Sequence, residues 1–157
     1  MGPAHNRVTA GASLADRTPS ESRTVMNANE LTATEARLAM SRGELDAETY
    51  VSACLARIHE REPDVAAWSY LNPREALASA RASDARKFSA QPLGGIPVGF
   101  KDIVDTVDMP TTYGSPIYRD HWPAVDAVCV ANTKAAGGFA LGKTVTTEFA
   151  SRYPGPT

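Results

Sequence analysis

One short apolar stretch that ends in a lysine constrains the fold more than any other part of the chain. Residues 96–100 follow two glycines, contain mainly apolar side chains and lead directly into Lys101 and Asp102. An apolar run of this length, bounded by turn residues, predicts a buried strand. A lysine is seldom fully buried unless it is paired, and from the end of a strand its ammonium commonly extends to water. A partly desolvated lysine, in contrast, loses its proton more easily and can act as a base.

Three helices are predicted before this strand. Thr32 and Glu35 have the spacing of a capping box at the start of the first helix. Asp46 is expected to cap the second helix, which should end at Pro63. Asn72 is followed by a proline and is expected to cap the third helix, which is rich in alanine.

The remaining elements predict the α/β class. Residues 65–71 alternate in the manner of a strand, Asp126 should cap a later helix, and residues 139–143 form the next main strand. A strand, a crossover helix and a second strand form a βαβ unit, so the two main strands should be parallel. Because parallel sheets are normally covered on both faces and few strands are predicted, we expect an open edge and an uncovered face.

Three motifs in register resemble the opening of the amidase signature family. They are Gly-Gly-Ile-Pro-Val-Gly-Phe-Lys-Asp at 94–102, Pro-Thr-Thr-Tyr-Gly-Ser at 110–115 and Leu-Gly-Lys-Thr-Val-Thr-Thr-Glu-Phe-Ala at 141–150. The similarity extends back to about Leu31. The resemblance implies that residues 30–157 are the N-terminal, incomplete portion of the mixed-sheet fold of that family.

The resemblance also implies a chemistry. Members of the family hydrolyse or transfer amides with a serine nucleophile, a second serine held through a cis peptide bond, and a lysine. The lysine of the strand-Lys-Asp motif corresponds to Lys101, which is therefore the expected catalytic residue. A serine hydroxyl must give its proton to a base, and a lysine can accept it only when neutral. We expect Lys101 to be sheltered from water for this reason.

Both serines of the family lie beyond the Gly-Pro-Thr element, where this chain ends at Thr157. No Gly-Gly-Ser stretch occurs in the sequence. Ser115 belongs to the Thr-Thr-x-Gly-Ser loop and Ser151 lacks a glycine-rich turn, so neither is expected to replace the nucleophile. The first hypothesis is therefore an N-terminal fragment of an amidase that carries only the lysine and is inactive as given.

Two further hypotheses remain open. The same motifs admit the A-type subunit of a glutamine-dependent tRNA amidotransferase, which requires partner subunits. A non-catalytic module could instead pair with a chain that completes the sheet, as a homodimer or with another polypeptide. The full-length enzyme would act on a small amide. Lys143 is interpreted as a structural or solvent-facing partner of Glu148, and Asp102 as a turn residue or a group that orients Lys101.

Composition excludes several classes of function. The 157 residues carry a net charge of -2 without a Lys/Arg-rich block, which argues against nucleic acid binding. No apolar run is long enough to predict a membrane span. Cys54 and Cys129 are predicted to be buried free thiols, which indicates a reducing, cytoplasmic location. The three histidines share no ligand spacing, so neither a metal nor another cofactor is expected.

The polar N-terminal segment has no hydrophobic periodicity. Residues 1–29 are rich in Ser, Thr, Arg and Gly and are predicted to form a disordered tail. The segment lacks the apolar region of a secretory signal. Met26 lies just before the first predicted helix, and we regard it as an alternative start of translation.

Overall fold

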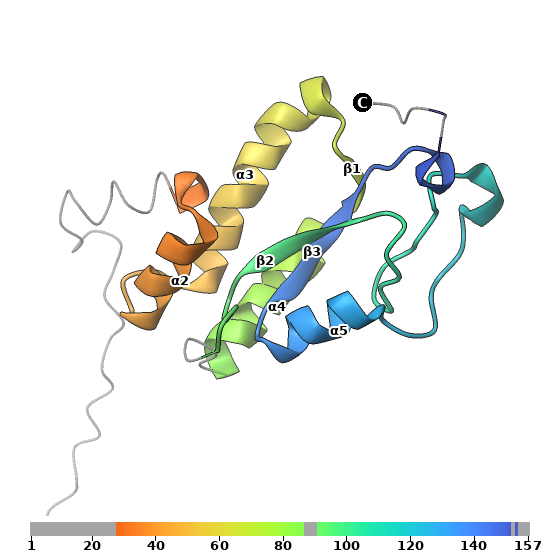
Figure 1. Ribbon diagram of the computed structural model, residues 1–157. Coiled ribbons are helices and arrows are strands. Elements are labelled where there is room, and N and C mark those ends of the chain that lie inside the picture. Colours follow the sequence, from red (N-terminus) through yellow and green to blue (C-terminus); the bar gives the residue numbers. More distant parts are fainter. Residues whose placement is uncertain (1–27, 87–90, 152, 154–157) are drawn as a thin grey trace, which may run out of the picture.

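Figure 1 shows the computed structural model of the protein, in which a three-stranded sheet lies among helices. The structure describes residues 28–86, 91–151 and 153. The strands are β1 (Trp68–Leu71), β2 (Pro97–Lys101) and β3 (Phe139–Thr144), in the order β1-β3-β2. The central strand β3 pairs with β2 in parallel and with β1 in antiparallel orientation. The predicted α/β class and the parallel pairing of the two main strands are therefore confirmed, in a mixed sheet.

Local sequence signals predicted some of the helical elements but not all. In chain order they are η2 (Ala28–Glu30), α2 (Ala33–Ser41), α3 (Ala47–Val65), α4 (Pro73–Arg86), η4 (Pro116–Tyr118), α5 (Val128–Ala135) and η5 (Glu148–Ala150). Thr32 and Glu35 form the predicted capping box, and the Asp46 carboxylate accepts a hydrogen bond from the Thr49 N–H at 2.6 Å. The Asn72 side chain accepts from the N–H groups of Arg74 and Glu75. Each of these caps satisfies helix-end N–H groups that have no partner within the helix.

Two predicted helix boundaries are wrong. Pro63 lies inside α3, which continues to Val65 and ends at Ala66, in the left-handed region with φ 49°. A proline so close to the end of a helix disturbs few further hydrogen bonds, so the chain can complete the turn. Asp126 does not cap α5, whose first flanking residue is Ala127 without a side-chain cap. Asp126 instead accepts from the Val107 N–H and pairs with Lys134, both at 2.8 Å.

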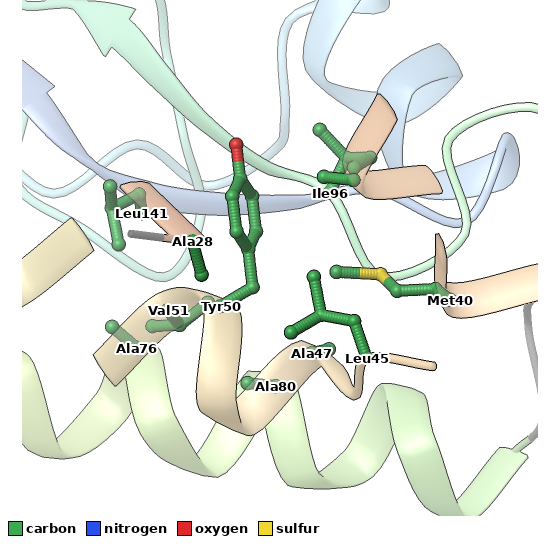
Figure 2. Packing of buried hydrophobic residues seen from close by; sticks show 11 residues of the cluster. Ala28, Met40, Leu45, Ala47, Tyr50, Val51, Ala76, Ala80, Ile96 and Leu141 are labelled. Atoms are coloured by element: carbon green, nitrogen blue, oxygen red, sulfur yellow. The ribbon is translucent and has the colours of Figure 1, made fainter. Parts of the chain in front are cut away.

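Hydrophobic clusters lie on both faces of the sheet. The larger cluster joins α2, α3 and α4 to the strands through Ile96 and Leu141. Figure 2 shows the Tyr50 ring of α3 extending into this cluster. A smaller cluster packs Val130 of α5 against Phe100 and Ala140. The expected uncovered face is therefore wrong: neighbouring residues of β3 point to opposite sides, and the crossover helix α5 covers the second side.

The structure describes only the end of the predicted tail, and the predicted burial of both cysteines is wrong. Residues 1–27 lie outside the described residues, whereas Ala28 and Asn29 are described and belong to η2, with Ala28 fully buried. Both cysteines are free, but Cys54 is half-buried and Cys129 is exposed. The neighbouring Val130 faces the sheet, so Cys129 is turned outward. Within the described residues, no helix is long and apolar enough to cross a bilayer.

A tryptophan packs closely over two glycines of the sheet. A Cβ atom added to Gly142 would lie 2.6 Å from the carbonyl oxygen of Tyr70 and 2.9 Å from the Trp68 ring. A Cβ atom added to Gly99 would lie 3.1 Å from the same ring. The absence of side chains at these positions lets the indole of β1 lie against β2 and β3.

Substitution of Gly142 by alanine should destabilise the fold. The new methyl group would meet a backbone carbonyl, which cannot move without disturbing the β1–β3 pairing, and we expect a loss of about 1–3 kcal/mol in the free energy of unfolding. Urea unfolding followed by circular dichroism measures this loss. Gly99→Ala is the control and should cost less, because its nearest neighbours are side-chain atoms. Equal stability of Gly142→Ala and the wild type would contradict the close packing.

Candidate active site

Lys101 lies at the end of β2 and is exposed. Its backbone pairs with Thr144 of β3, and its carbonyl oxygen accepts hydrogen bonds from the N–H groups of Ile103 and Val104 at 2.8 and 2.9 Å. The position at the tip of the strand agrees with the sequence prediction. The expected shelter from water is not observed, because the Lys101 side chain is exposed. Among the described residues, this side chain has no ion-pair or hydrogen-bond partner. Whether Lys101 is catalytic stays a prediction at this point.

The buried lysine is Lys143 of β3, which pairs with Phe100, the residue before Lys101. Its side chain is 0% exposed, and its Nζ atom donates to the carbonyl oxygens of Val104 and Pro110 at 2.8 and 3.3 Å and to Thr111 Oγ1 at 2.5 Å. An Asp102 carboxylate oxygen lies 3.4 Å away. These contacts agree with a structural role for Lys143, but both the solvent-facing position and Glu148 as the partner are wrong.

Asp102 connects the two lysines. Its carboxylate accepts hydrogen bonds from the backbone N–H of Thr112, at 3.0 Å, and from the Thr112 hydroxyl. Its own N–H donates to the Thr144 carbonyl oxygen at 2.8 Å, and its carbonyl oxygen accepts from the Tyr113 N–H at 2.9 Å. The interpretation of Asp102 as a turn residue agrees with these hydrogen bonds, and the structure adds a buried ion pair with Lys143.

The Lys143–Asp102 pair is shielded from water, with side chains only 0% and 2% exposed. Burial lowers the pKa of Lys143, since removal from water disfavours the charged ammonium, while the Asp102 carboxylate opposes this shift. The geometry favours a charged pair, because the ammonium has four oxygen neighbours. Such a pair is costly to break, because one uncompensated charge would remain in the interior.

The two lysines occupy opposite faces of the sheet. In β3, Leu141 has no partner in β2, because Val98 pairs with Ala140 and Gly99 pairs with Gly142. Beyond this irregularity, Lys143 pairs with Phe100, which is buried against α5, and Thr144 pairs with Lys101. Since successive residues of a strand alternate between faces, Lys143 points to the α5 side and Lys101 to the other.

Aromatic side chains gather in the loops that follow β2 and β3. The Tyr113 ring lies 5.0 Å from Tyr118, 5.9 Å from His121 and 6.5 Å from Phe149, measured between centroids. The Phe149 N–H donates to the Tyr113 carbonyl oxygen at 2.8 Å. Tyr113, Phe149 and Ala150 have φ between 48° and 55°. Non-glycine residues with positive φ are strained, and such strain gathers at functional sites.

Polar contacts hold the same loops together. Ser115 is buried, and its hydroxyl donates to Glu148 at 2.7 Å and caps η4 by accepting from the Ile117 N–H. This agrees with the expected role of Ser115 in shaping the loop. Ser151 is exposed after η5. No group of three His, Cys, Asp or Glu side chains arranged to hold a metal occurs in the part of the chain that is described.

The sequence contained a signal for the buried pair, but it was ambiguous. Both β2 and β3 are mainly apolar runs with a lysine at or next to their last residue, so burial could be assigned to either lysine. The Tyr113 hydroxyl also has a partner that was not predicted, Asp105, at 2.7 Å. Another acidic residue of the same turn, Asp108, pairs with Lys134 at 3.1 Å.

The Tyr113–Asp105 contact predicts an unusual titration. The hydrogen bond to the Asp105 carboxylate, together with burial, raises the pKa of Tyr113 to about 12. The folded protein thus holds this proton more tightly than the unfolded chain, whose tyrosine pKa is about 10. The contribution of the Tyr113–Asp105 hydrogen bond to the free energy of unfolding is complete below about pH 10, and it is lost as the pH rises through about 12.

The ultraviolet titration curve of the wild type minus the curve of Tyr113→Phe gives the ionisation of the Tyr113 phenol alone. In Asp105→Asn the pKa should move back toward 10, because a neutral amide replaces the carboxylate. Tyr118→Phe serves as the control, since it removes a neighbouring phenol and retains the Asp105 contact. A wild-type midpoint near 10 would show that the contact is absent.

Comparison with known proteins places these features in a family. Residues 49–156 match the Amidase family. The A-type subunit of the glutamyl-tRNA(Gln) amidotransferase of Chloroflexus aggregans is 43% identical over 123 residues, which are 76% of this chain and 25% of that protein. The protein of the same name from Oleidesulfovibrio alaskensis is 44% identical over 120 residues, or 76% of this chain and 25% of that protein. The chain thus spans about a quarter of the length of the curated relatives it matches.

Solved structures agree with the sequence relatives. The native peptide amidase from Stenotrophomonas maltophilia superimposes with a TM-score of 0.72 and 32% identity over 79% of this chain and 26% of that one. An amidase family protein from Bacillus anthracis gives a TM-score of 0.71 and 28% identity, covering 86% of this chain and 28% of that one. With three motifs in register, a family match over most of the chain and this common fold, the chain belongs to the amidase signature family.

Proposed function

We propose that this chain forms the lysine-bearing part of an enzyme that cleaves or transfers amide C–N bonds, with Lys101 as the base. Family membership supports the reaction class. The observation that carries the role of Lys101 is its place in the strand-Lys-Asp motif, at the tip of β2, with its ammonium exposed and unpaired among the described residues. An unpaired amine at this position can meet groups supplied by further polypeptide.

The proposed reaction follows the logic of serine nucleophiles activated by a base. A serine hydroxyl attacks the amide carbonyl carbon, and its proton passes through a second serine to Nζ of Lys101. The C–N bond then breaks, and the departing nitrogen receives that proton, which leaves Lys101 neutral. Water attacks the resulting ester in the same way, and the acid product leaves. The two serines are implied by family resemblance.

The environment of Lys101 has to be completed from elsewhere. The 157 residues contain no Gly-Gly-Ser stretch, so in this proposal the serines belong to further polypeptide, continuous with this chain or separate from it. The same polypeptide would cover Lys101 and remove water from its ammonium, which favours the neutral amine required of a base. We therefore expect no turnover from the 157-residue chain alone.

A second candidate is the A-type component of a tRNA-dependent amidotransferase. The names of the relatives from Chloroflexus aggregans and Oleidesulfovibrio alaskensis favour it, at 43% and 44% identity. The peptide amidase from Stenotrophomonas maltophilia favours an independent amidase, at 32% identity. Turnover of a simple amide by the purified full-length protein supports the independent amidase, whereas a strict need for partner polypeptides and glutamyl-tRNA supports the amidotransferase.

A non-catalytic module that binds a partner chain is the alternative from another class. Several large apolar side chains are exposed, among them Ile117 of η4 at 78%, Val125 at 71% and Val128 of α5 at 76%. Exposed apolar groups of this kind occur at interfaces between polypeptides. If the partner is a second copy of this chain, sedimentation analysis of the purified chain should show a dimer. A cytoplasmic location, favoured by the free cysteines, stays a prediction.

Substitution of Lys101 should abolish turnover in the full-length protein. Lys101→Ala removes the proton acceptor, and Lys101→Arg retains the charge but cannot give a neutral base at ordinary pH. Both variants should lower kcat at least about a hundredfold, because general base catalysis contributes about that much or more. Steady-state kinetics with a small amide measures the effect, and a circular dichroism spectrum checks the fold.

Ser151→Ala is the matched control, since Ser151 is exposed and is not expected to be the nucleophile. Its kcat should stay within about twofold of the wild type. Near-normal turnover in Lys101→Ala would remove Lys101 from the mechanism. Loss of turnover in Ser151→Ala would instead identify a nucleophile within this chain.

A further inference from the structure

The Lys143 ammonium holds together the turn that immediately follows Lys101. Its four oxygen neighbours all come from residues 102–111, namely Asp102, Val104, Pro110 and Thr111. Two of them are backbone carbonyl oxygens, which an apolar side chain could not satisfy. One buried cation therefore contacts both the first and the last residue of a ten-residue turn.

Stability alone does not explain this arrangement. A buried ion pair is often no more stable than apolar side chains of similar volume, because both charges lose their hydration. The α5 side of the sheet is already lined by Phe100, Met109 and Val130, which could accommodate such a side chain. A buried charge at this position can instead favour one conformation of the turn, because its oxygen partners must converge on one point.

That conformation sets the direction of Lys101. The residue that follows it, Asp102, is held at its N–H by Thr144, at its carbonyl oxygen by Tyr113 and at its carboxylate by Thr112 and Lys143. Because all these contacts lie within one residue of Lys101, its backbone has little freedom to rotate. The Lys101 side chain thus leaves β2 on the face opposite Lys143.

We propose that Lys143 is a positioning residue for the amidase reaction, which it serves by fixing, through Asp102 and the turn 102–111, the direction in which Lys101 extends from β2. Lys143 acts from the far side of the sheet and does not touch the substrate. The inference rests on the proposed function, since it requires Lys101 to be the base. A small displacement of a base reduces the rate much more than it affects substrate binding.

The first test is kinetic and uses the full-length protein. Lys143→Met should lower kcat about 10- to 100-fold, with KM changed less than about threefold, because only the orientation of the base is lost. Arg81→Met is the control: this arginine is also ion-paired, to Glu48 of α3, and that pair involves no residue of the turn 102–111. Its kcat should stay within about twofold of the wild type.

A double-mutant cycle separates positioning from simple loss of folded protein. If Lys143 acts through Lys101, then adding Lys143→Met to Lys101→Ala should cause no further loss of residual kcat. A purely structural role would reduce activity by the same factor in both backgrounds and would overturn the proposal. An unchanged kcat in Lys143→Met would overturn it as well.

Hydrogen exchange tests the turn independently of activity. In Lys143→Met the amides of Asp102 and Tyr113 should exchange at least about tenfold faster, while those of α3 keep their rates, because the loosening is local. Unchanged exchange at Asp102 and Tyr113 would overturn the inference and leave the proposed function intact. Normal turnover in Lys101→Ala would instead remove the proposed function, and the catalytic role of Lys143 with it.

A second variant covers the case in which Lys143→Met does not fold. Lys143→Met combined with Asp102→Asn removes both charges, so neither is left uncompensated in the interior. This double variant should fold, but the carbonyl groups of Val104 and Pro110 still lack their donor, and kcat should stay at least about tenfold below the wild type. Wild-type kcat in the double variant would overturn the proposal.

Discussion

A buried ammonium must be surrounded by oxygen atoms, and this requirement organises the half of the molecule that contains the candidate site. Lys143 lies at the end of the central strand β3 with a side chain that is 0% exposed. Its partners are the carboxylate of Asp102 and oxygen atoms of the turn that leaves β2. The sheet pairing brings β2 beside β3, and the cation then fixes where the chain goes after β2.

The same requirement separates the roles of two similar strands. Lys101 and Lys143 both follow apolar runs. Lys143 points to the α5 side, whereas Lys101 points to the opposite side and is exposed. The loops beyond them meet through Tyr113 and Phe149, whose backbones have positive φ. The end of the sheet thus combines a buried charge, loops with strained backbones and an exposed amine.

Features that depend on a few neighbouring residues could be predicted from the sequence. The capping box of Thr32 and Glu35 and the caps at Asp46 and Asn72 are satisfied within three residues, so no tertiary contact is needed to specify them. The boundary at Pro63 and the cap at Asp126 were wrong. Helix α3 completes its last turn after the proline, and Asp126 has distant partners, Val107 and Lys134, that compete for its carboxylate.

By itself the sequence determined the α/β class, the parallel pairing of the two main strands, the family and the place of Lys101 at the tip of a strand, because these follow from periodicity and contiguous motifs. Only the tertiary structure decided which of two strand-ending lysines is buried. That choice depends on Leu141, the residue of β3 without a partner in β2, because this irregularity changes which residues of β3 face α5. It also depends on the contact between Lys143 and Asp102, which are 41 residues apart in the sequence. The alternation of faces and the pairing of charges are properties of the assembled sheet, so a one-dimensional pattern does not contain them.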